Sequence, residues 1–444
     1  MKEFNNKRQL NPPQILALGF GLLILVGALL LNLPISSKNG ESIGFINALF
    51  TSASSVCVTG LTVVNTLDHW TNFGHLVIIL LIQMGGLGFM TMATIVALFL
   101  GKKISLKDRL VIKEQLNQDT MTGLVKLTKY VIYATFSIEF LGAVLLSTRL
   151  IPIYGLGRGI WYSIFHAISA FCNAGFDLFG DSLVPYVGDL LINLTISGLI
   201  ILGGLGFSVY LDINDKRCFR KLNLHSKLVI IISISLLLIG SVSIFLIEYG
   251  NPETLKYLSL KDKVLASFFQ STISRTAGFY SVPLAKLEES TVFIMIILMF
   301  IGGSPGSTGG GIKTTTFGVL FLATRSVVKG SEDVVVFRKR ISTEIIHRAL
   351  AIASISMAII LIVSLILTLT EEANFIDILY ESTSAFATVG VSRDLSPNLS
   401  GLGKLIIALT MYTGRVGPLT MALAFASRRR PSNYKYSEGN IMVG

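Results

Sequence analysis

Apolar residues gather in long stretches along the chain instead of alternating with polar ones. Eight of these stretches reach the ~20 residues that a membrane-crossing helix needs. They predict helices at 14–33, 72–100, 124–148, 189–211, 228–248, 291–328 (interrupted), 344–370 and 401–426. Four shorter stretches lie between them, at 44–57, 159–172, 262–274 and 374–387. A helix of about 13 residues is only ~20 Å long, which is typical of a segment that enters the membrane and turns back.

The composition also points to a membrane protein. Of the 444 residues, 52% are hydrophobic and 14% are charged, against roughly 25% charged in soluble domains. This sparse ionic surface excludes an ordinary globular cytosolic enzyme, and the apolar content excludes a disordered chain. The three cysteines and five histidines show no disulfide framework and no metal-ligand spacing, so no cofactor is expected.

Positive charge is concentrated on one side of the predicted membrane. The N-terminus, three connectors and the tail from residue 427 carry 22 Lys and Arg residues against 8 acids, whereas the opposite connectors carry 9 against 13. Cytoplasmic loops are enriched in Lys and Arg, so both termini are predicted to be cytoplasmic. The net charge of +11 therefore reflects topology in the lipid bilayer, and no nucleic-acid partner is expected.

One sequence unit occurs four times. Its short segments align without gaps as ALFTSASSVCVTG, SIFHAISAFCNAG, ASFFQSTISRTAG and ILYESTSAFATVG, which end at Gly60, Gly175, Gly278 and Gly390. Each copy has an aromatic residue ten positions before this glycine and a hydroxyl residue six positions before it. A G-x-x-G follows 24 to 28 residues later, at Gly85–Gly88, Gly203–Gly206, Gly303–Gly306 and Gly414–Gly417. The unit is therefore a helix, a short re-entrant helix, a glycine turn and a second helix.

These units predict the architecture. Each crosses the membrane twice, so all four enter from the same side and are related by an axis along the membrane normal. We expect an all-α polytopic membrane protein with four helix–pore-helix–helix repeats in pseudo-fourfold symmetry around one central pore (8 transmembrane helices plus 4 re-entrant pore helices). The repeats span 12–100, 124–211, 228–328 and 344–426, with cytoplasmic connectors 101–123, 212–227 and 329–343 and a cytoplasmic tail 427–444.

The glycine turns are suited to holding a bare cation. Inward-facing backbone carbonyls can replace the water shell of a monovalent cation, and glycine adopts the required dihedral angles and permits close approach. The partly negative C-terminal ends of the short helices also favour a cation. The turns contain no ring of carboxylates, so carbonyls must supply most ligands. The alternative, that the glycines only cap helices and permit packing, is disfavoured by their recurrence at four matching positions.

This arrangement resembles the Trk/Ktr/HKT superfamily of potassium transporters, most closely the Ktr-type membrane subunit, over nearly the whole chain. The resemblance implies K+ uptake through a selectivity filter that binds K+ at carbonyls of three residues per copy: Val58, Thr59, Gly60, Asn173, Ala174, Gly175, Thr276, Ala277, Gly278, Thr388, Val389 and Gly390. It also implies a homodimer and a separate cytosolic ring of nucleotide-binding regulators (KtrA-like). Some plant relatives have serine at the first filter position and favour Na+, so four glycines point to K+.

The third copy departs from the pattern at GGSPGSTGGGIKTTT, residues 302–316. Six glycines and a proline cannot continue as regular helix, and such backbone is tolerated at membrane depth only inside protein or along a watery cavity. The resemblance implies an intramembrane gating loop here, with these candidate residues: Gly302, Gly303, Gly306, Gly309, Gly310, Gly311 and Lys313. A phosphate-binding Walker A loop is disfavoured because Ile312 separates Gly311 from Lys313 and an apolar helix precedes it.

Arg415 is a charged residue deep in the last predicted helix. It lies thirteen residues before Arg428, ~20 Å as helix, and an intramembrane charge usually marks an ion path. We predict that Arg415 lies below the filter and raises the barrier to cations, with Lys313 in a similar role. The alternative is a structural arginine bonded to carbonyls or a carboxylate. The sequence names no partner for Arg275, three residues before Gly278.

Three other functions compete with K+ uptake. A G-x-S-x-G at 302–306 would make Ser304 the nucleophile of an intramembrane serine hydrolase, but no histidine lies in the flanking membrane helices. An alternating-access carrier would need paired carboxylates, and Glu139 and Glu248 do not recur among the copies. A sodium-selective or Na+-coupled member of the superfamily is a further alternative. The protein is not expected to be an enzyme, and its expected location is the cell (plasma) membrane.

Overall fold

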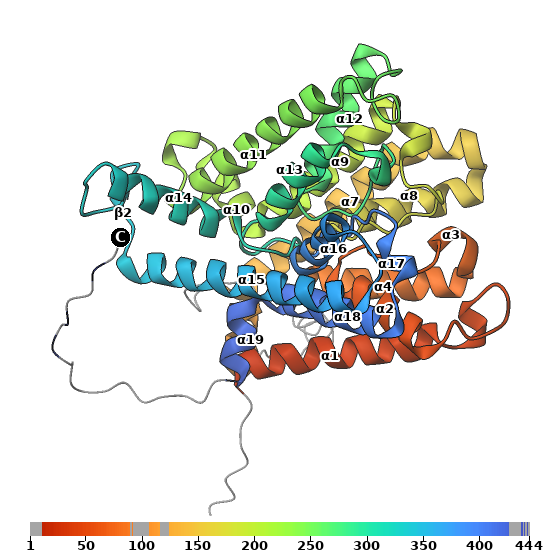
Figure 1. Cartoon of the computed structure of the whole chain (residues 1–444), viewed down its shortest axis with the longest axis horizontal. Helices are drawn as coiled ribbons and strands as arrows, with labels where there is room; N and C mark the ends of the chain where they lie inside the picture. The colour runs from red at the N-terminus through yellow and green to blue at the C-terminus, as the bar shows by residue number, and fades with distance from the viewer. Residues whose placement is uncertain are drawn as a thin grey trace, which may run out of the picture.

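The computed structural model describes residues 11–88, 91, 106–115, 124–425, 437, 439 and 442 (Figure 1). Most of this part of the chain is helical. Two short strands, β1 (Val335–Val336) and β2 (Lys339–Arg340), pair antiparallel in the predicted connector 329–343. Most of the predicted connector 101–123 and of the tail 427–444 lies outside the described residues.

Four described helices are long and apolar enough to cross a membrane without a break: α1 (Pro12–Leu31), α7 (Leu124–Tyr154), α11 (Leu224–Glu248) and α15 (Thr343–Thr370). Their outward faces carry bare apolar side chains, such as Phe140 at 70% and Leu369 at 80% exposure. Large apolar surfaces of this kind are rare on soluble monomers, whereas hydrocarbon accommodates them. The chain is therefore a multi-pass membrane protein.

Each long helix is followed by one of the predicted short helices and packs against it. These are α2 (Phe45–Cys57), α8 (Leu156–Phe171), α12 (Leu260–Ile273) and α16 (Phe375–Ala387). In copies 1 and 3 a serine hydroxyl fastens the pair, because Ser52 donates to the carbonyl of Ile24 (2.7 Å) and Ser271 to that of Leu237 (2.9 Å). The C-terminal halves of the short helices are buried in the protein interior.

The second helix of each copy breaks at the second glycine of its G-x-x-G or near it. Helix α4 (Asn72–Leu87) ends before Gly88, α9 (Leu190–Leu205) before Gly206 and α18 (Gly401–Val416) before Gly417, and these glycines have φ of +81°, +92° and +95°. Beyond them α10 (Phe207–Lys216) turns by 91° from α9, and α19 (Pro418–Phe425) follows α18. The interruption of 291–328 is confirmed, since α13 (Glu289–Phe300) and α14 (Thr314–Val328) are separate.

The prediction of unbroken spans at 189–211 and 401–426 is therefore wrong. Glycine with positive φ cannot continue a right-handed helix, although hydropathy runs on across the break. Span 72–100 cannot be followed to its end, because residues 89, 90 and 92–100 lie outside the described part. The remaining short elements are η1 (Pro34–Ser36), α3 (Thr66–His69), α6 (Leu106–Gln115), η2 (Val184–Tyr186), η3 (Phe219–Lys221), η4 (Leu284–Lys286) and α17 (Leu395–Asn398).

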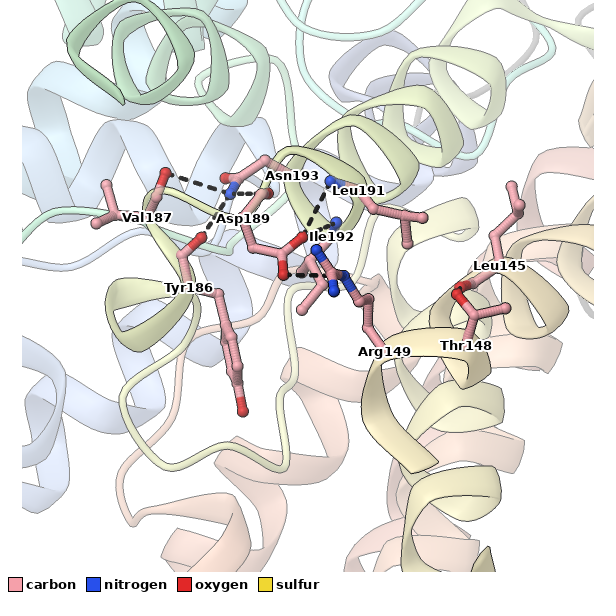
Figure 2. A network of polar contacts seen from close by, with 9 residues as sticks. All are labelled: Leu145, Thr148, Arg149, Tyr186, Val187, Asp189, Leu191, Ile192 and Asn193. Atoms are coloured by element: carbon pink, nitrogen blue, oxygen red, sulfur yellow. Dashed lines mark hydrogen bonds and ion pairs between the residues drawn. The ribbon is translucent and has the colours of Figure 1, made fainter. Parts of the chain in front are cut away.

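A polar network fixes the start of α9 beside the end of α7 (Figure 2). Asp189 caps α9 by accepting from the N–H groups of Leu191 (3.0 Å) and Ile192 (3.1 Å). The same carboxylate pairs with Arg149 of α7 at 3.3 Å. The Asn193 amide donates to the carbonyls of Tyr186 (2.7 Å) and Asp189 (2.8 Å). These contacts set the angle at which α9 enters the molecule.

Candidate ion-conducting site

The glycines that end the four short segments lie against one another. A methyl group on Gly60 would lie 3.4 Å from the Cα of Gly175, one on Gly175 would collide with the Cα of Gly278, and one on Gly390 would lie 2.8 Å from the Cα of Gly60. A methyl on Gly278 would lie 3.2 Å from the carbonyl oxygen of Val389, just before Gly390. The same methyl would lie equally close, at 3.2 Å, to the carbonyl oxygen of Thr59 in copy 1, so all four turns converge. The packing of the helices gives their order, because α4 packs on α8, α9 on α12, α13 (Glu289–Phe300) on α16, and α18 on α2. This order places copies 1 and 3 opposite each other, as well as copies 2 and 4.

The backbone of each turn has the same unusual conformation. Two positions before each glycine stands a residue with positive φ: Val58 (57°), Asn173 (62°), Thr276 (68°) and Thr388 (51°). The glycines themselves have φ of 104°, 69°, 72° and 91°, while the residue between has negative φ. Such conformations cost roughly 1–3 kcal/mol each in β-branched residues, here Val58, Thr276 and Thr388, and gather at functional sites, whereas asparagine tolerates them better. Alternating handedness turns successive peptide groups to one side.

Hydrogen bonds show which side that is. Before each glycine, the N–H donates back to its own short helix: Thr59 to the Ser54 carbonyl (2.8 Å), Ala174 to Ser169 (2.7 Å), Ala277 to Ile273 (3.2 Å) and Val389 to Ser384 (2.8 Å). In a trans peptide the C=O points opposite to the N–H of the same unit. In all four copies the carbonyl two positions before the glycine therefore points away from its short helix.

Two serine hydroxyls extend this arrangement by one residue. The N–H of Gly60 donates to the Ser54 hydroxyl at 3.0 Å, and that of Gly390 donates to the Ser384 hydroxyl at 3.1 Å. The carbonyls of Thr59 and Val389, in the same peptide units, are thereby turned away from α2 and α16. The sequence pattern marked these hydroxyl positions but gave them no role. They accept the glycine N–H groups and so fix the direction of the preceding carbonyls.

The irregular segment 302–316 lies directly against the turns. The Thr308 hydroxyl donates to the Asn173 side-chain oxygen (3.0 Å) and the Phe171 carbonyl (3.2 Å) of copy 2. A methyl group on Gly309 would lie 2.5 Å from the Thr276 hydroxyl, and one on Gly310 would collide with the Thr388 side chain. Three of the four turns therefore have this loop against their left-handed residue.

The loop is also tied to α9, because Ser304 N–H donates to the Gly204 carbonyl (3.0 Å) and Thr308 N–H to that of Gly203 (3.2 Å). The predicted loop residues Gly302 and Gly303 lie beside Gly310 and Gly309. The Ser304 hydroxyl accepts from Thr314 at 3.0 Å, and threonine is no general base. This contact gives no support to a serine nucleophile.

Arg415 reaches the loop from α18. It donates to the Thr308 carbonyl, to that of Gly85 and, at 3.0 Å, to that of Gly86 at the end of α4. One side chain thus joins copies 4, 3 and 1. Lys313 donates to the Gly309 carbonyl at 2.7 Å. Both cations line a cavity of about 590 Å³ on the side of the loop away from the turns, bounded also by α14, α15 and α19.

Arg275, for which the sequence named no partner, is buried beside α11. Its guanidinium donates to the hydroxyl (3.1 Å) and the carbonyl (3.4 Å) of Ser233. These two residues are 42 positions apart, and no local pattern signals their contact. Arg275 therefore fastens the end of α12 to the long helix of its own copy.

The comparisons with known proteins identify the family of the chain. Residues 21–436 match the family model TrkH, described as a cation transport protein. The chain belongs to the TrkH family. Its members are ion transporters, so the expectation that the protein is not an enzyme is confirmed, as is the resemblance to the Trk and Ktr systems.

Relatives of this TrkH-family chain match over nearly their whole length. The Ktr system potassium uptake protein B of Bacillus subtilis is 45% identical over 98% of this chain and 97% of its own. The potassium/sodium uptake protein NtpJ of Enterococcus hirae is 42% identical over 99% and 98%. The crystal structure of the potassium transporter TrkH from Vibrio parahaemolyticus superimposes with a TM-score of 0.73 at 18% identity, covering 96% of this chain and 87% of that one, which establishes the fold.

Proposed function

We propose that this protein carries K+ into the cell through a passage bounded by the four glycine turns, which act as its selectivity filter. The observation that carries the proposal is the common direction of the turn carbonyls, set by N–H bonds to the short helices in all four copies. Oxygens aimed at a shared axis can replace the hydration shell of a monovalent cation. The names of the Bacillus subtilis and Vibrio alginolyticus relatives, potassium uptake proteins, support the same ion.

The filter uses backbone oxygens of the twelve predicted positions, 58–60, 173–175, 276–278 and 388–390. It belongs to a pseudo-fourfold set of repeats with both termini in the cytoplasm. Uptake runs down the electrochemical gradient, in which a potential of −100 mV supplies about 2.3 kcal/mol per charge. Carbonyl ligands leave no need for the paired carboxylates of a carrier. Glu139 contacts Gln83 (3.3 Å), while Glu248 contacts Asn251 and Thr254, so the two carboxylates have separate partners.

The loop 302–316 acts as the gate below this filter. Its contacts with Asn173, Thr276 and Thr388 support that role, because a loop in this position blocks the continuation of the passage into the cavity. Arg415 holds the loop through the Thr308 carbonyl and adds a positive charge that opposes cations at rest. Lys313, which belongs to the loop and is bonded to its Gly309 carbonyl, adds a second positive charge at the same place.

The chain works as the ion-translocating subunit of a regulated system, as a homodimer. The full-length similarity to proteins named as part of a Ktr system supports a separate regulatory component. We infer that this component is a cytosolic nucleotide-binding ring, as the family resemblance implies. Size-exclusion chromatography with light scattering tests the dimer directly, and a monomeric mass for the detergent-solubilised protein would contradict it.

Uptake of radiolabelled Rb+ and of Na+ into K+-loaded proteoliposomes tests the filter. Serine at Gly60, Gly175, Gly278 or Gly390 adds a side chain where φ is positive and the neighbouring turn is in contact, so each variant should lower the ratio of Rb+ to Na+ uptake. Gly198→Ser, in α9 with nothing within 4 Å of its added Cβ, is the matched control. An unchanged ratio in all four variants would refute the filter.

A sodium-transporting protein is the second candidate, because the Enterococcus hirae relative is named a potassium/sodium uptake protein. The same vesicles decide between the two. K+ uptake predicts that unlabelled K+ competes with Rb+ far better than Na+ does. Na+ uptake that exceeds Rb+ uptake in the unaltered protein would favour the sodium alternative, and Rb+ uptake that requires external Na+ would favour coupling.

A further inference from the structure

We propose that His166 and Glu381 are positioning residues that set ion selectivity by holding the segments that directly follow the filter glycines. We call these segments the outer ends of the filter strands. The inference rests on the proposed filter. Both stand nine positions before a filter glycine, in copies 2 and 4, and both are fully buried. The equivalent residues of copies 1 and 3 are Thr51 and Phe269. Copies 2 and 4, which lie opposite each other, thus have at this position a polar side chain that can bond the segment after the filter glycine. We call His166 and Glu381 the two braces.

His166 links α8 to the segment that follows the filter. Its Nδ1 donates to the Tyr162 carbonyl at 2.7 Å, and its Nε2 accepts from the N–H of Leu178 at 3.2 Å. A carbonyl can only accept and an amide can only donate, so this pair of bonds requires the neutral Nδ1–H tautomer. The ring also stacks on Phe179, with centroids 3.9 Å apart and planes 12° apart.

The segment held by His166 supports its neighbours in turn. Asn65, beyond the copy 1 turn, donates to the Gly180 carbonyl at 2.8 Å. Tyr280, beyond the copy 3 turn, donates its N–H to the Ser182 hydroxyl (3.0 Å) and accepts from the N–H of Leu183 (2.8 Å). Copies 1 and 3 therefore both bond the copy 2 segment that His166 holds. In this way one histidine stabilises the outer ends of three filter strands.

Glu381 performs this task for the fourth strand. Its carboxylate accepts from the Ser392 hydroxyl at 2.7 Å and from the Ser396 hydroxyl. The Ser392 oxygen in turn accepts from the N–H groups of Leu395 (3.1 Å) and Ser396 (3.3 Å). The segment beyond Gly390 is thereby folded back onto α16. Loss of the carboxylate would leave two hydroxyls without their acceptor and would loosen that segment, which would still be joined to α16 by the ion pair of Arg393 with Asp377.

These braces bear on selectivity because a narrow ring of carbonyls discriminates between cations by the positions of its oxygens. The glycine turns carry strained left-handed residues, which persist only while surrounding contacts hold them. Releasing the outer end lets the turns relax, which makes the oxygen ring adaptable to smaller Na+. The inner ends of the turns of copies 2, 3 and 4 stay in contact with the loop, so the passage stays formed while its preference weakens.

The variants are His166→Phe and Glu381→Met, tested in full-length protein in proteoliposomes. Phenylalanine keeps the stacking on Phe179, and the protein already has phenylalanine at the equivalent position of copy 3, yet it cannot accept from Leu178. We expect the Rb+ to Na+ uptake ratio to fall about tenfold, equivalent to ~1.4 kcal/mol, in His166→Phe. A smaller fall is expected in Glu381→Met, since that brace serves one strand.

Three controls separate positioning from general damage. Thr51→Val alters the equivalent position of copy 1, where the hydroxyl, within the part of the chain that the structure describes, bonds only the Asn47 carbonyl of its own helix, and should leave the ratio unchanged. His166→Gln and Glu381→Gln keep a side-chain acceptor and should recover most of the selectivity. If His166→Phe yields no monodisperse protein, Glu381→Met and Ser396→Ala decide the question.

The outcomes distinguish this inference from the proposed function. Folded His166→Phe and Glu381→Met with an unaltered ratio, while Gly60→Ser changes it, would overturn the braces and leave the filter standing. An unaltered ratio in the four glycine variants as well would overturn the filter itself. A fall in total uptake with a constant ratio would mean that the two residues serve folding alone.

Discussion

Replacing Arg415 with alanine tests whether a tether holds the gate closed. The guanidinium contacts the loop at one point, the Thr308 carbonyl, and its other acceptors, Gly85 and Gly86, belong to α4. Bonds to α4 are present whether the loop is closed or displaced. The loop's closed state therefore loses one charge-assisted hydrogen bond in the variant, while the hydroxyl and backbone bonds of Thr308 to copy 2 stay in place.

The magnitude follows from that single contact. A hydrogen bond to a charged group contributes about 1.5–3 kcal/mol, and 1.4 kcal/mol is a factor of about ten in an equilibrium constant. The ratio of open to closed loop should rise at least tenfold in Arg415→Ala. With no regulator present, the initial rate of radiolabelled Rb+ uptake should rise by a similar factor until the open state predominates.

Two variants separate the tether from the charge. Arg415→Lys keeps the charge but cannot span the Thr308 carbonyl and α4 together, so an intermediate rate is expected. Arg348→Ala removes a cation from the wall of the same cavity, and within the described residues Arg348 has no hydrogen bond to the loop. A rate in Arg348→Ala equal to that in Arg415→Ala would show that cavity potential controls the flux. An unchanged rate in Arg415→Ala would remove the gating role altogether.

Two predictions concern the support of the turns. Ser384→Ala leaves the buried N–H of Gly390 without its acceptor, so the protein should lose about 1–3 kcal/mol of stability, measured by thermal unfolding in detergent. An unshifted midpoint would argue that water replaces the hydroxyl. Gly414→Ala forces a methyl group into a backbone carbonyl of α16 and should cost about 1–3 kcal/mol or abolish folding. Gly198→Ala is its control, expected to be neutral or stabilising.

The short helices and their glycines could be predicted from the sequence because both depend on the conformation of a few neighbouring residues. A turn with positive φ and a close neighbour selects glycine, and four matching glycines are visible without any structure. The breaks at Gly206 and Gly417 were missed because the apolar stretches continue through them. A local signal did exist at Gly417, since Pro418 follows it and proline is favoured in the first turn of a helix. That signal marked a new helix, α19.

Contacts between residues far apart in the sequence could not be predicted from a local sequence pattern. Arg415 could be placed below the turns from its depth, but its bonds to carbonyls in two other copies depend on how the copies pack. The same holds for the contact of Arg275 with Ser233 and for that of His166 with Leu178. Neither Ser233 nor Leu178 lies at a position that the repeat pattern distinguishes. Sequence periodicity predicts what the copies share, and these residues are places where the copies differ.

The differences between the copies bear on how the proposed gate could work within a single chain. Gly86, Gly204, Ser304 and Arg415 occupy the same position of the four copies, and they bond in pairs: Arg415 to the Gly86 carbonyl and the Ser304 N–H to the Gly204 carbonyl. Four identical subunits would place an arginine at all four positions. Neighbouring guanidinium groups around one passage would repel each other, and their combined charge would oppose cations in every state of the loop. In the proposed gate, one arginine bonded to a loop from another copy gives a barrier that a movement of that loop would remove.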